Sequence, residues 1–349
     1  MQRCAMRACE SRWETVALSA LSSFAALAVI ALAVCLPLSA ARTEQPPVCA
    51  KCGKEITDAC FKTNGVYYHA TCFLCDRCGR PIQGAYTGYN GGNYHRECFE
   101  ESVAKRCAVC GAVIQGEYLL DYWGNACHLS HRDEMPACEY CGRFISPGTS
   151  GGGERYRDGR HVCNVCRKSA VTKRDEANAI LGEVARHMER FGMTVNVGEL
   201  DLHLVDLDEM REKSGKGSHR LTGYTDFAET KSLLGVPLER RIDVYVLRGM
   251  PRIEVISMLA HELCHVWQFR AGRLKNDLAF CEGSCNYASF LVLRNYRSRE
   301  ADYATDNLIE DRNPVYGEGL RRVRRFAEDE GISVWLQRLR EKDDLPRGY

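Results

Sequence analysis

Hydrophobic residues recur at helical spacing in the second half of the chain. Between residues 172 and 192 they occur every three or four positions, which predicts an amphipathic helix that ends at Gly192. Two short apolar clusters, at 202–207 and 242–247, predict strands. Together these elements predict an α+β domain over residues 172–349.

Two further helices follow from the same pattern. The first is predicted over residues 253–270, with Pro251 before its start and Gly272 after its end. Its apolar face consists of Ile256, Ala260, Leu263 and Trp267. The second begins near Glu282 and continues through the apolar residues Tyr287, Phe290, Leu291 and Leu293.

The start of the chain has a different pattern. Residues 16–41 carry no charged side chain and follow Arg3, Arg7 and Arg12. This pattern predicts a signal peptide or a membrane anchor over residues 1–41, and therefore an exported or membrane-anchored protein. Ser39 and Ala41 fit a cleavage site before Arg42, whereas the length of the uncharged segment also fits a single span.

Composition adds one strong signal, because the chain contains 20 cysteines. Most of them lie between positions 49 and 166, which indicates either disulfides or metal sites. The formal net charge of +1 lacks the basic excess of nucleic-acid-binding proteins. We therefore expect no nucleic-acid partner.

The spacing of the first cysteines favours zinc. Each of two C-x-x-C pairs is followed, after the same interval, by a closing His and Cys, and a disulfide framework would leave both histidines unexplained. The order resembles a LIM domain, predicted over residues 49–100 with two closed structural zinc sites. The first site comprises Cys49, Cys52, His69 and Cys72, and the second comprises Cys75, Cys78, His95 and Cys98.

A second, less regular LIM-like module is predicted over residues 105–168. Its last site is all cysteine and comprises Cys138, Cys141, Cys163 and Cys166. For its first site we predict Cys107, Cys110, Cys127 and His131, with His128 as the competing ligand. About four structural zinc ions are thus expected, and such modules mostly bind protein surfaces.

The predicted helix at 253–270 carries the sequence HELCH. On a helix, this spacing places His261 and His265 on one face, where both can bind one zinc ion, with Glu262 beside the open position. The alternative is an amphipathic core helix that carries two histidines by chance. Two histidines and one carboxylate would leave a position for water, whose pKa zinc lowers to about 7, and Glu262 would accept its proton.

Glu282 is the predicted third ligand of this catalytic zinc, because it would project from the first turn of the next helix. Asp277, Glu300 and Asp302 are rival candidates for the third position. Tyr316, on a later turn-rich loop, is a candidate hydrogen-bond donor to a developing oxyanion, although packing is an equal explanation.

The strand that leads into the helix at 253–270 is a further candidate. Strands in this position in zinc peptidases often pair with an extended substrate, so residues 243–247 are predicted to offer their edge. An interior strand is the alternative.

Taken together, residues 49 to about 340 resemble the LIM-domain metallopeptidases known best from plants as ubiquitin-activated regulators of organ growth. The resemblance rests on the LIM pattern and on the runs Ala260–Trp267, Glu282–Cys285 and Tyr316–Gly319. It implies a zincin-like peptidase domain in which His261, His265 and Glu282 bind zinc and Glu262 is the catalytic base. The plant proteins carry ubiquitin-interacting helices where this chain has its hydrophobic leader, so an exported, bacterial-type relative is expected.

These observations predict a zinc-dependent endopeptidase that acts on a protein or peptide substrate and binds a protein partner through its LIM-type modules. Its membrane anchorage, if retained, would be through residues 16–41. The alternative is a LIM-type binding scaffold whose peptidase-like domain is inactive. An intact HELCH sequence together with Glu282 favours the enzyme.

Overall fold

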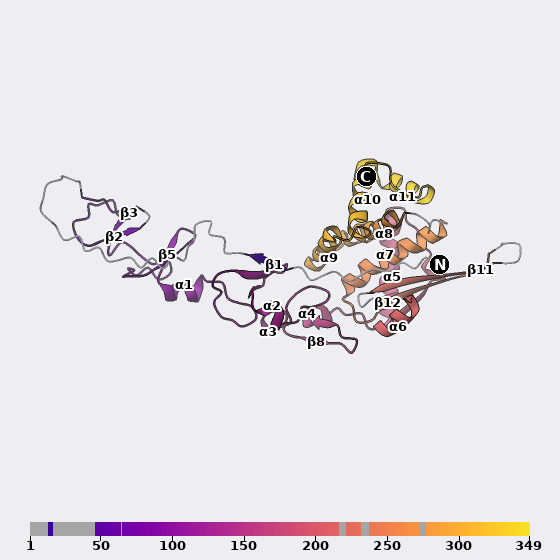
Figure 1. Ribbon diagram of the computed structural model, residues 1–349, viewed down its shortest axis with the longest axis horizontal. Helices are drawn as coiled ribbons and strands as arrows, with labels where there is room; N and C mark the ends of the chain where they lie inside the picture. The colour runs from indigo at the N-terminus through magenta and orange to yellow at the C-terminus, as the bar shows by residue number, and fades with distance from the viewer. Residues whose placement is uncertain (1–12, 17–45, 64, 216–220, 232–236, 272–276) are drawn as a thin grey trace. The chain divides into compact units, whose positions relative to one another are not determined.

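The computed structural model describes residues 13–16, 46–63, 65–215, 221–231, 237–271 and 277–349 (Figure 1). Apart from Val16, the uncharged leader segment predicted at residues 16–41 lies outside the described residues. Within the described part, no helix combines the length and the hydropathy needed to cross a membrane.

The described residues form two compact units, each considered by itself. The N-terminal unit contains residues 14–120 and 124–132, and the C-terminal unit contains residues 121–123 and 133–349 together with Trp13. The module predicted at 105–168 is therefore divided between the two units.

The N-terminal unit is built from short hairpins that carry the Cys and His pairs. Its elements are β1 (Trp13–Val16), β2 (Cys60–Thr63), β3 (Val66–His69), β4 (Thr87–Tyr89), β5 (Gly92–Tyr94), α1 (Arg96–Ser102), β6 (Tyr118–Asp121) and β7 (Ala126–His128). A small buried cluster of Phe73, Cys75 and Ile82 lies in its first part. A core this small needs further support, which metal can supply.

The C-terminal unit begins with a cysteine-rich segment and continues into a mixed α and β domain, in agreement with the predicted α+β class. The segment contains α2 (His131–Glu134), α3 (Pro147–Ser150), β8 (Gly153–Arg155), β9 (His161–Cys163) and α4 (Asn164–Arg167). The domain contains α5 (Arg174–Arg190), η1 (Val197–Glu199), β10 (Asp201–Val205), α6 (Leu207–Ser214), β11 (Gly223–Lys231), β12 (Pro237–Leu247), α7 (Arg252–Arg270), α8 (Leu278–Leu293), α9 (Arg299–Glu310), α10 (Gly317–Glu330) and α11 (Ile332–Glu341).

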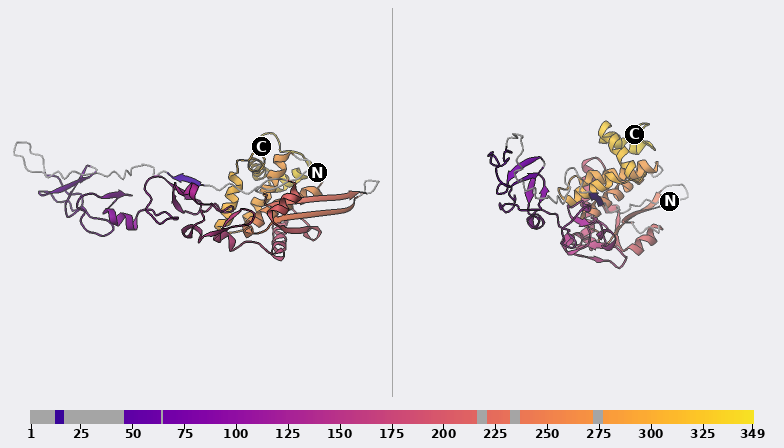
Figure 2. Two further views of the ribbon diagram at one scale, coloured as in Figure 1. Left: turned by 60° about the horizontal axis from the view of Figure 1, so that its bottom comes forward. Right: turned by 60° about the vertical axis from the view of Figure 1, so that its left-hand side comes forward.

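A three-stranded sheet forms one side of this domain. Its order is β10-β12-β11, with β12 parallel to β10 and antiparallel to β11. Figures 1 and 2 show β11 and β12 as a long antiparallel pair. Residues 243–247 therefore form part of the central strand, with both edges occupied, and the prediction that they offer an edge to substrate is wrong. Among the described strands, β11 is the edge strand next to α7.

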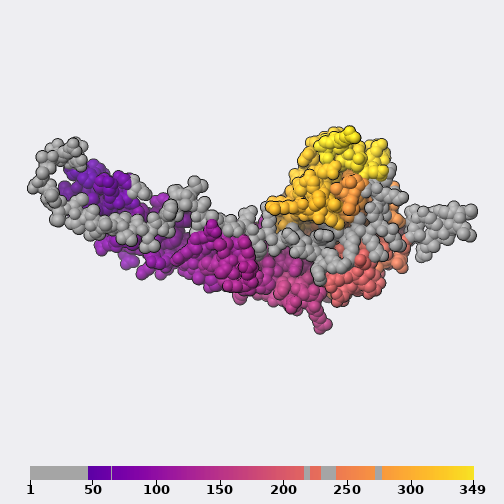
Figure 3. Space-filling view, viewed as in Figure 1, coloured from indigo at the N-terminus to yellow at the C-terminus, as the bar shows by residue number. Residues whose placement is uncertain are grey.

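Helices α7 and α8 form the centre of the domain. All residues of α7 from Val255 to Gln268 are buried, and so are all those of α8 from Phe280 to Phe290. Both helices are therefore covered on every side, which explains why polar side chains on them must find partners in the interior. Helices α9 to α11, coloured orange to yellow, form one continuous mass in the space-filling view (Figure 3).

Glycines allow α8 and α10 to approach closely. A Cβ atom on Gly319 would lie 2.3 Å from the carbonyl oxygen of Ala279, and one on Gly283 would lie 2.3 Å from the carbonyl carbon of Gly319. Real Cβ atoms do not approach backbone this closely, so both positions require glycine. The close packing of α8 fixes the position of Glu282, which lies beside Gly283.

We predict that Gly319→Ala lowers the free energy of unfolding of the C-terminal unit by at least about 2 kcal/mol, because two helices must move apart. Thermal unfolding of the full chain would measure the effect. Gly182→Ala in α5 is the matched control, because its Cβ would meet only the guanidinium end of Arg186 at 3.5 Å. The control is expected to be neutral or stabilising, and equal destabilisation by both changes would contradict the packing argument.

Candidate metal centre

The two histidines of the HELCH sequence lie together in the interior of α7. His261 is 0% exposed and His265 is 1% exposed. Their Nε2 atoms are 3.1 Å apart, which is the result of i, i+4 spacing on a helix. Two ring nitrogens therefore face a common point from one helix.

Glu282 approaches the same point from α8. Its Oε2 atom lies 3.1 Å from Nε2 of His261 and 3.4 Å from Nε2 of His265. Tetrahedral zinc with bonds of about 2.0–2.1 Å places neighbouring ligand atoms about 3.3–3.4 Å apart. The spacing of these three atoms fits that geometry, and the buried Oε1 atom of Glu282 has no hydrogen-bond partner among the described residues.

The electrostatics of Glu282 also suit a ligand. Burial by itself would raise the pKa of this carboxyl, but the two histidines at hydrogen-bond distance hold its pKa well below the ordinary value. Glu282 is therefore a carboxylate, which is the form that binds a metal ion.

The rival third ligands lie elsewhere. The carboxylate of Asp277 accepts a hydrogen bond from the backbone N–H of Phe280 and caps α8. Glu300 and Asp302 lie in the first turn of α9. Of the four predicted candidates, the structure brings only Glu282 into hydrogen-bond contact with the two histidines.

Cys285 is a neighbour that the ligand prediction did not include. Its Sγ atom lies 3.3 Å from Nδ1 of His265, and the two histidines and Cys285 form a group with ligand atoms within 4.8 Å of one another. However, Nδ1 is on the other side of the imidazole from the Nε2 atom that faces His261 and Glu282. The set that converges on one point is thus two Nε2 atoms and the Glu282 carboxylate, and Cys285 lies behind it.

Glu262 is buried next to this point. Its Oε2 atom accepts a 2.6 Å hydrogen bond from the hydroxyl of Thr225 on β11, and its Oε1 atom has no hydrogen-bond partner in the described part of the chain. Burial raises the pKa of this carboxyl, against the lowering effect of the two histidines and Thr225. A raised pKa suits a group that accepts and returns a proton near neutral pH. Nothing in the local sequence around Thr225 indicates this contact.

Amide side chains orient both histidines. Nδ1 of His261 lies 2.8 Å from Oδ1 of Asn286, and Nδ1 of His265 lies 3.1 Å from Oε1 of Gln268. Asn286 uses its Nδ2 to donate to the backbone carbonyl of Tyr316, so its oxygen faces His261. Each Nδ1 therefore carries the proton, which leaves each Nε2 lone pair available to a metal. The i, i+4 spacing of Glu282 and Asn286 is the sequence signal that could have found this partner.

We predict that Asn286→Leu weakens zinc binding at this centre about 10- to 100-fold, because the imidazole of His261 loses the acceptor that fixes its tautomer. Competition with a chromophoric zinc chelator would measure the zinc affinity of both chains. Asn295→Leu, at an exposed position two residues after the end of α8, is the control, since the Asn295 amide bonds the backbone carbonyls of Leu291 and Val292 and the side chain of His187 rather than a residue of the metal centre. Unchanged zinc affinity in a folded Asn286→Leu chain would contradict the orienting role.

Tyr316 lies at the start of α10, close to the centre. Its ring centroid is 6.4 Å from that of His261, with an interplanar angle of 30°. Its backbone carbonyl accepts the hydrogen bond from Asn286. The predicted position of Tyr316 beside the metal helices thus agrees with the structure, while its role toward an oxyanion stays a prediction.

The remaining predicted ligands form four groups. In the N-terminal unit, ligand atoms lie within 4.8 Å of one another in Cys49, Cys52, His69 and Cys72, in Cys75, Cys78, His95 and Cys98, and in Cys107, Cys110, His128 and His131. The C-terminal unit holds the all-cysteine group of Cys138, Cys141, Cys163 and Cys166, in which Cys141 and Cys163 have sulfur atoms 3.6 Å apart. None of the cysteines of these groups forms a disulfide.

One member of the third group differs from the prediction. The structure places His128 with its Nδ1 atom 3.4 Å from Sγ of Cys110, and His131 completes the group. Cys127 is fully buried and lies outside it. Consecutive residues of a strand point to opposite faces, so β7 can present only one of Cys127 and His128 to this group.

The all-cysteine group is part of the main core. Its four residues belong to the same buried cluster as the interior residues of α5, α7 and α8. The backbone N–H of Val171 donates to the carbonyl of Met250, and the backbone N–H of Gly249 donates to the carbonyl of Val171. These two hydrogen bonds connect the segment after Cys166 to the turn before α7. The all-cysteine group therefore packs on the same unit as the metal centre.

Comparison with known proteins agrees with the first part of this assignment. Residues 49–90 match the LIM domain family model. The chain is 27% identical over 295 residues to LIM domain-containing protein HDR3 of Oryza sativa subsp. japonica, covering 73% of this chain and 58% of the relative. It is 24% identical over 365 residues to Protein DA1 of Arabidopsis thaliana, covering 85% of this chain and 63% of the relative.

A third relative, Protein DA1-related 2 of Arabidopsis thaliana, is 23% identical over 378 residues, covering 85% of this chain and 64% of the relative. The chain thus spans less than two thirds of the length of each of these relatives. The comparisons confirm the predicted LIM domain and the similarity to plant LIM-containing proteins. The chain therefore contains a LIM domain and resembles plant LIM and DA1 proteins over most of its own length.

Proposed function

We propose that the chain is a zinc-dependent endopeptidase with a zincin-like catalytic domain, and that its LIM-type modules bind a protein partner. The observation that carries the proposal is the convergence of His261, His265 and Glu282 at 3.1–3.4 Å beside the buried carboxyl of Glu262. A zinc ion bound by these three residues would supply a Lewis acid that polarises a carbonyl and acidifies water.

The residues of the chain have separate roles in this proposal. Glu262 accepts a proton and returns it to the leaving amine, and the hydroxyl of Thr225 holds its Oε2 in place. Asn286 and Gln268 keep the ring nitrogens of the histidines oriented. Tyr316 lies close enough to the centre to be a candidate donor toward developing negative charge.

The sheet suggests how a polypeptide would bind. Strand β11 is an edge strand, and it passes close to Glu262, because a Cβ atom on Gly223 would lie 3.0 Å from Oε1 of that residue. An extended substrate that pairs with the outer edge of β11 would pass beside the general base. Strand β11, and not residues 243–247, is therefore the strand that we propose to pair with substrate.

Cleavage of an unfolded protein by the full chain tests the proposal directly. Fragments with new internal termini, identified by mass spectrometry, are expected, and they should disappear with Glu262→Gln. A native chain that holds zinc at the metal centre but leaves a panel of unfolded proteins intact would favour the alternative, a LIM-type scaffold with an inactive peptidase-like domain. Capture of a partner by the N-terminal unit alone would then be its main activity.

We further propose that the protein is an exported or membrane-anchored relative of bacterial type, through the uncharged segment at residues 16–41. Fractionation of cells that express the full chain, with N-terminal sequencing of the product, separates the two forms. Recovery with membranes and an intact N-terminus indicates an anchor, and recovery outside the membrane with a new terminus near Arg42 indicates cleavage. Recovery in the cytosol with an intact N-terminus would contradict both.

A further inference from the structure

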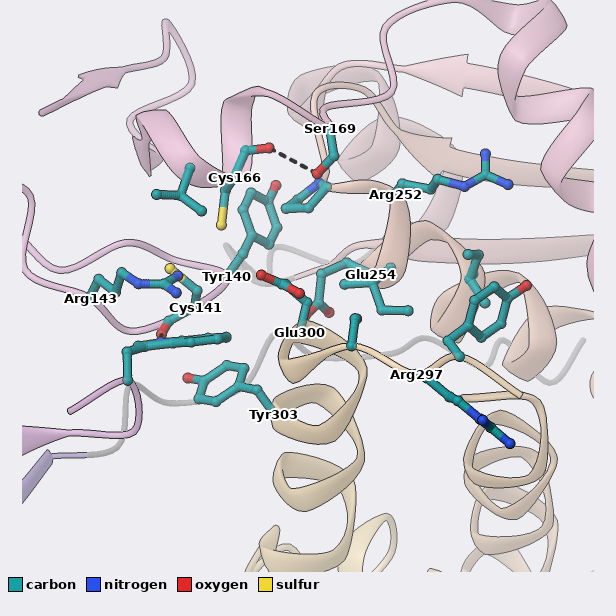
Figure 4. Close-up of a pocket in the computed structure, with 17 residues that line it drawn as sticks. Tyr140, Cys141, Arg143, Cys166, Ser169, Arg252, Glu254, Arg297, Glu300 and Tyr303 are labelled. Atoms are coloured by element: carbon teal, nitrogen blue, oxygen red, sulfur yellow. Dashed lines mark hydrogen bonds between the residues drawn. The ribbon is translucent and has the colours of Figure 1, made fainter. Parts of the chain in front are cut away.

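A second pocket lies within the C-terminal unit, away from the metal centre. It has a volume of about 510 Å³ and lies between the all-cysteine group and the first turns of α7 and α9 (Figure 4). Volumes of about 300–1,000 Å³ are typical of sites for small ligands. None of the residues of the metal centre lines this pocket. It therefore needs its own explanation.

Two acidic side chains face into this pocket. Figure 4 shows that Glu254 of α7 and Glu300 of α9 both direct their carboxyl groups inward, whereas Arg252 and Arg297 point away. Arg252 is already paired with Glu183. The described residues provide no ion pair for either carboxylate. The pocket therefore presents acidic groups that a cationic ligand could bind.

Arg143 provides an independent sign of a ligand. It is 8% exposed, and its guanidinium lies 3.5 Å from the centroid of the Trp123 ring. Its Nη1 atom is buried and has no hydrogen-bond acceptor among the described residues. A buried donor without an acceptor is costly, so an oxygen of a ligand in the pocket would satisfy it.

Aromatic rings form the walls between these charged groups. Trp123 and Tyr303 are in contact, with ring centroids 5.2 Å apart, and the buried ring of Tyr140 also lines the pocket. Such rings favour the hydrocarbon part and the cationic head of a basic side chain. The pocket thus offers a donor for a ligand oxygen, aromatic walls, the exposed carboxylate of Glu300 and the carboxyl group of Glu254, whose pKa burial raises to about 7.

We propose that this pocket binds a basic amino-acid unit, arginine or lysine, with its carboxylate or carbonyl oxygen on Arg143 and its cationic head on Glu254 and Glu300. The unit could be a free amino acid or a residue within a polypeptide, because both present the same two groups. Glu254 precedes His261 by seven residues on α7. A bound ligand would therefore link the cysteine-rich segment to the helix that carries the metal ligands.

Isothermal titration of the full, zinc-loaded chain with four probes tests this assignment. L-arginine is expected to bind with a dissociation constant below about 1 mM. Agmatine, which has the same guanidinium but no carboxylate, is expected to bind about tenfold more weakly, because Arg143 gains no acceptor. L-glutamate should not bind. The tripeptide Gly-Arg-Gly distinguishes the two possible ligands. If it binds as tightly as L-arginine, the pocket accepts a residue within a polypeptide. If it does not bind, the pocket accepts only the free amino acid.

Variants locate the binding in the pocket. Glu300 is exposed, so the Glu300→Gln chain should fold normally. We expect this change to lower the affinity for L-arginine and for agmatine by a similar factor, about tenfold. Arg143→Gln is expected to weaken L-arginine but not agmatine, provided that zinc content and thermal unfolding show a folded chain. Glu189→Gln, on the exposed surface of α5, is the matched control and should change the affinity for neither L-arginine nor agmatine.

The proposal is overturned by either of two results. One is no binding of either L-arginine or Gly-Arg-Gly at about 10 mM, a concentration that would reveal even weak affinity. The other is binding that Glu300→Gln and Glu254→Gln both leave unchanged in folded chains. Neither result depends on peptidase activity, so failure here leaves the function of the metal centre to be judged separately.

Discussion

Glu262→Gln is expected to lower kcat for peptide cleavage by about 100- to 10,000-fold while zinc content and thermal stability stay unchanged. The amide has the shape of the carboxyl, and its oxygen can still accept the hydrogen bond from Thr225. The amide cannot accept a proton, so only the rate of the chemical step should fall. Steady-state kinetics on a fluorogenic peptide, together with metal analysis, would measure both quantities.

A control at the surface distinguishes this effect from a general effect of removing one charge. Glu189→Gln, on the exposed face of α5, makes the same chemical change and should leave kcat within about twofold of the native value. A Glu262→Gln chain that binds zinc normally and retains most of its activity would contradict the role of Glu262 as general base.

The second large effect is expected from the all-cysteine group. Cys163→Ser should release one zinc ion, lower the thermal unfolding temperature of the C-terminal unit and abolish cleavage. Cys163 is fully buried, and its group shares the core with α5, α7 and α8. Structural zinc contributes about 10–16 kcal/mol to the folding of small zinc modules, so its loss here should disrupt the neighbouring core.

Cys75→Ser is the matched comparison in the N-terminal unit. Cys75 is also buried and also belongs to a group of four ligands, but that group lies in the other compact unit. We expect it to release one zinc ion and unfold part of the LIM domain while cleavage of a short peptide continues. Equal loss of peptide cleavage in both variants would contradict the assignment of the all-cysteine group to the catalytic unit.

Local patterns in the sequence predicted the parts of the site that lie close together in the chain. The helical period predicted α5 and α7, and the HELCH spacing predicted that His261 and His265 share a face. Glu282 was predictable because an apolar helical pattern follows it, although α8 begins at Leu278, four residues earlier than predicted, so that Glu282 lies in the second turn and not the first. The repeated Cys and His intervals predicted three of the four structural groups by the same kind of local reasoning.

Contacts between distant segments could not be predicted in this way. Thr225 reaches Glu262 across 37 positions, and nothing near Thr225 marks it. The central place of β12 depends on β10 and β11 pairing with it from both sides, which its own residues do not specify. Cys127, His128 and His131 are three possible ligands within five positions, and the choice depends on the pairing of β7 with β6.

Zinc content of the full chain tests the central claim most directly. Four Cys and His groups and the metal centre together predict five zinc ions per native chain. The double variant His261→Ala, His265→Ala is expected to hold four zinc ions, to unfold at a lower temperature than the native chain because two buried side chains and a bound ion are lost, and to cleave no peptide. A folded double variant with the same zinc content as the native chain would show that His261 and His265 hold no metal, and the proposed metallopeptidase would be wrong.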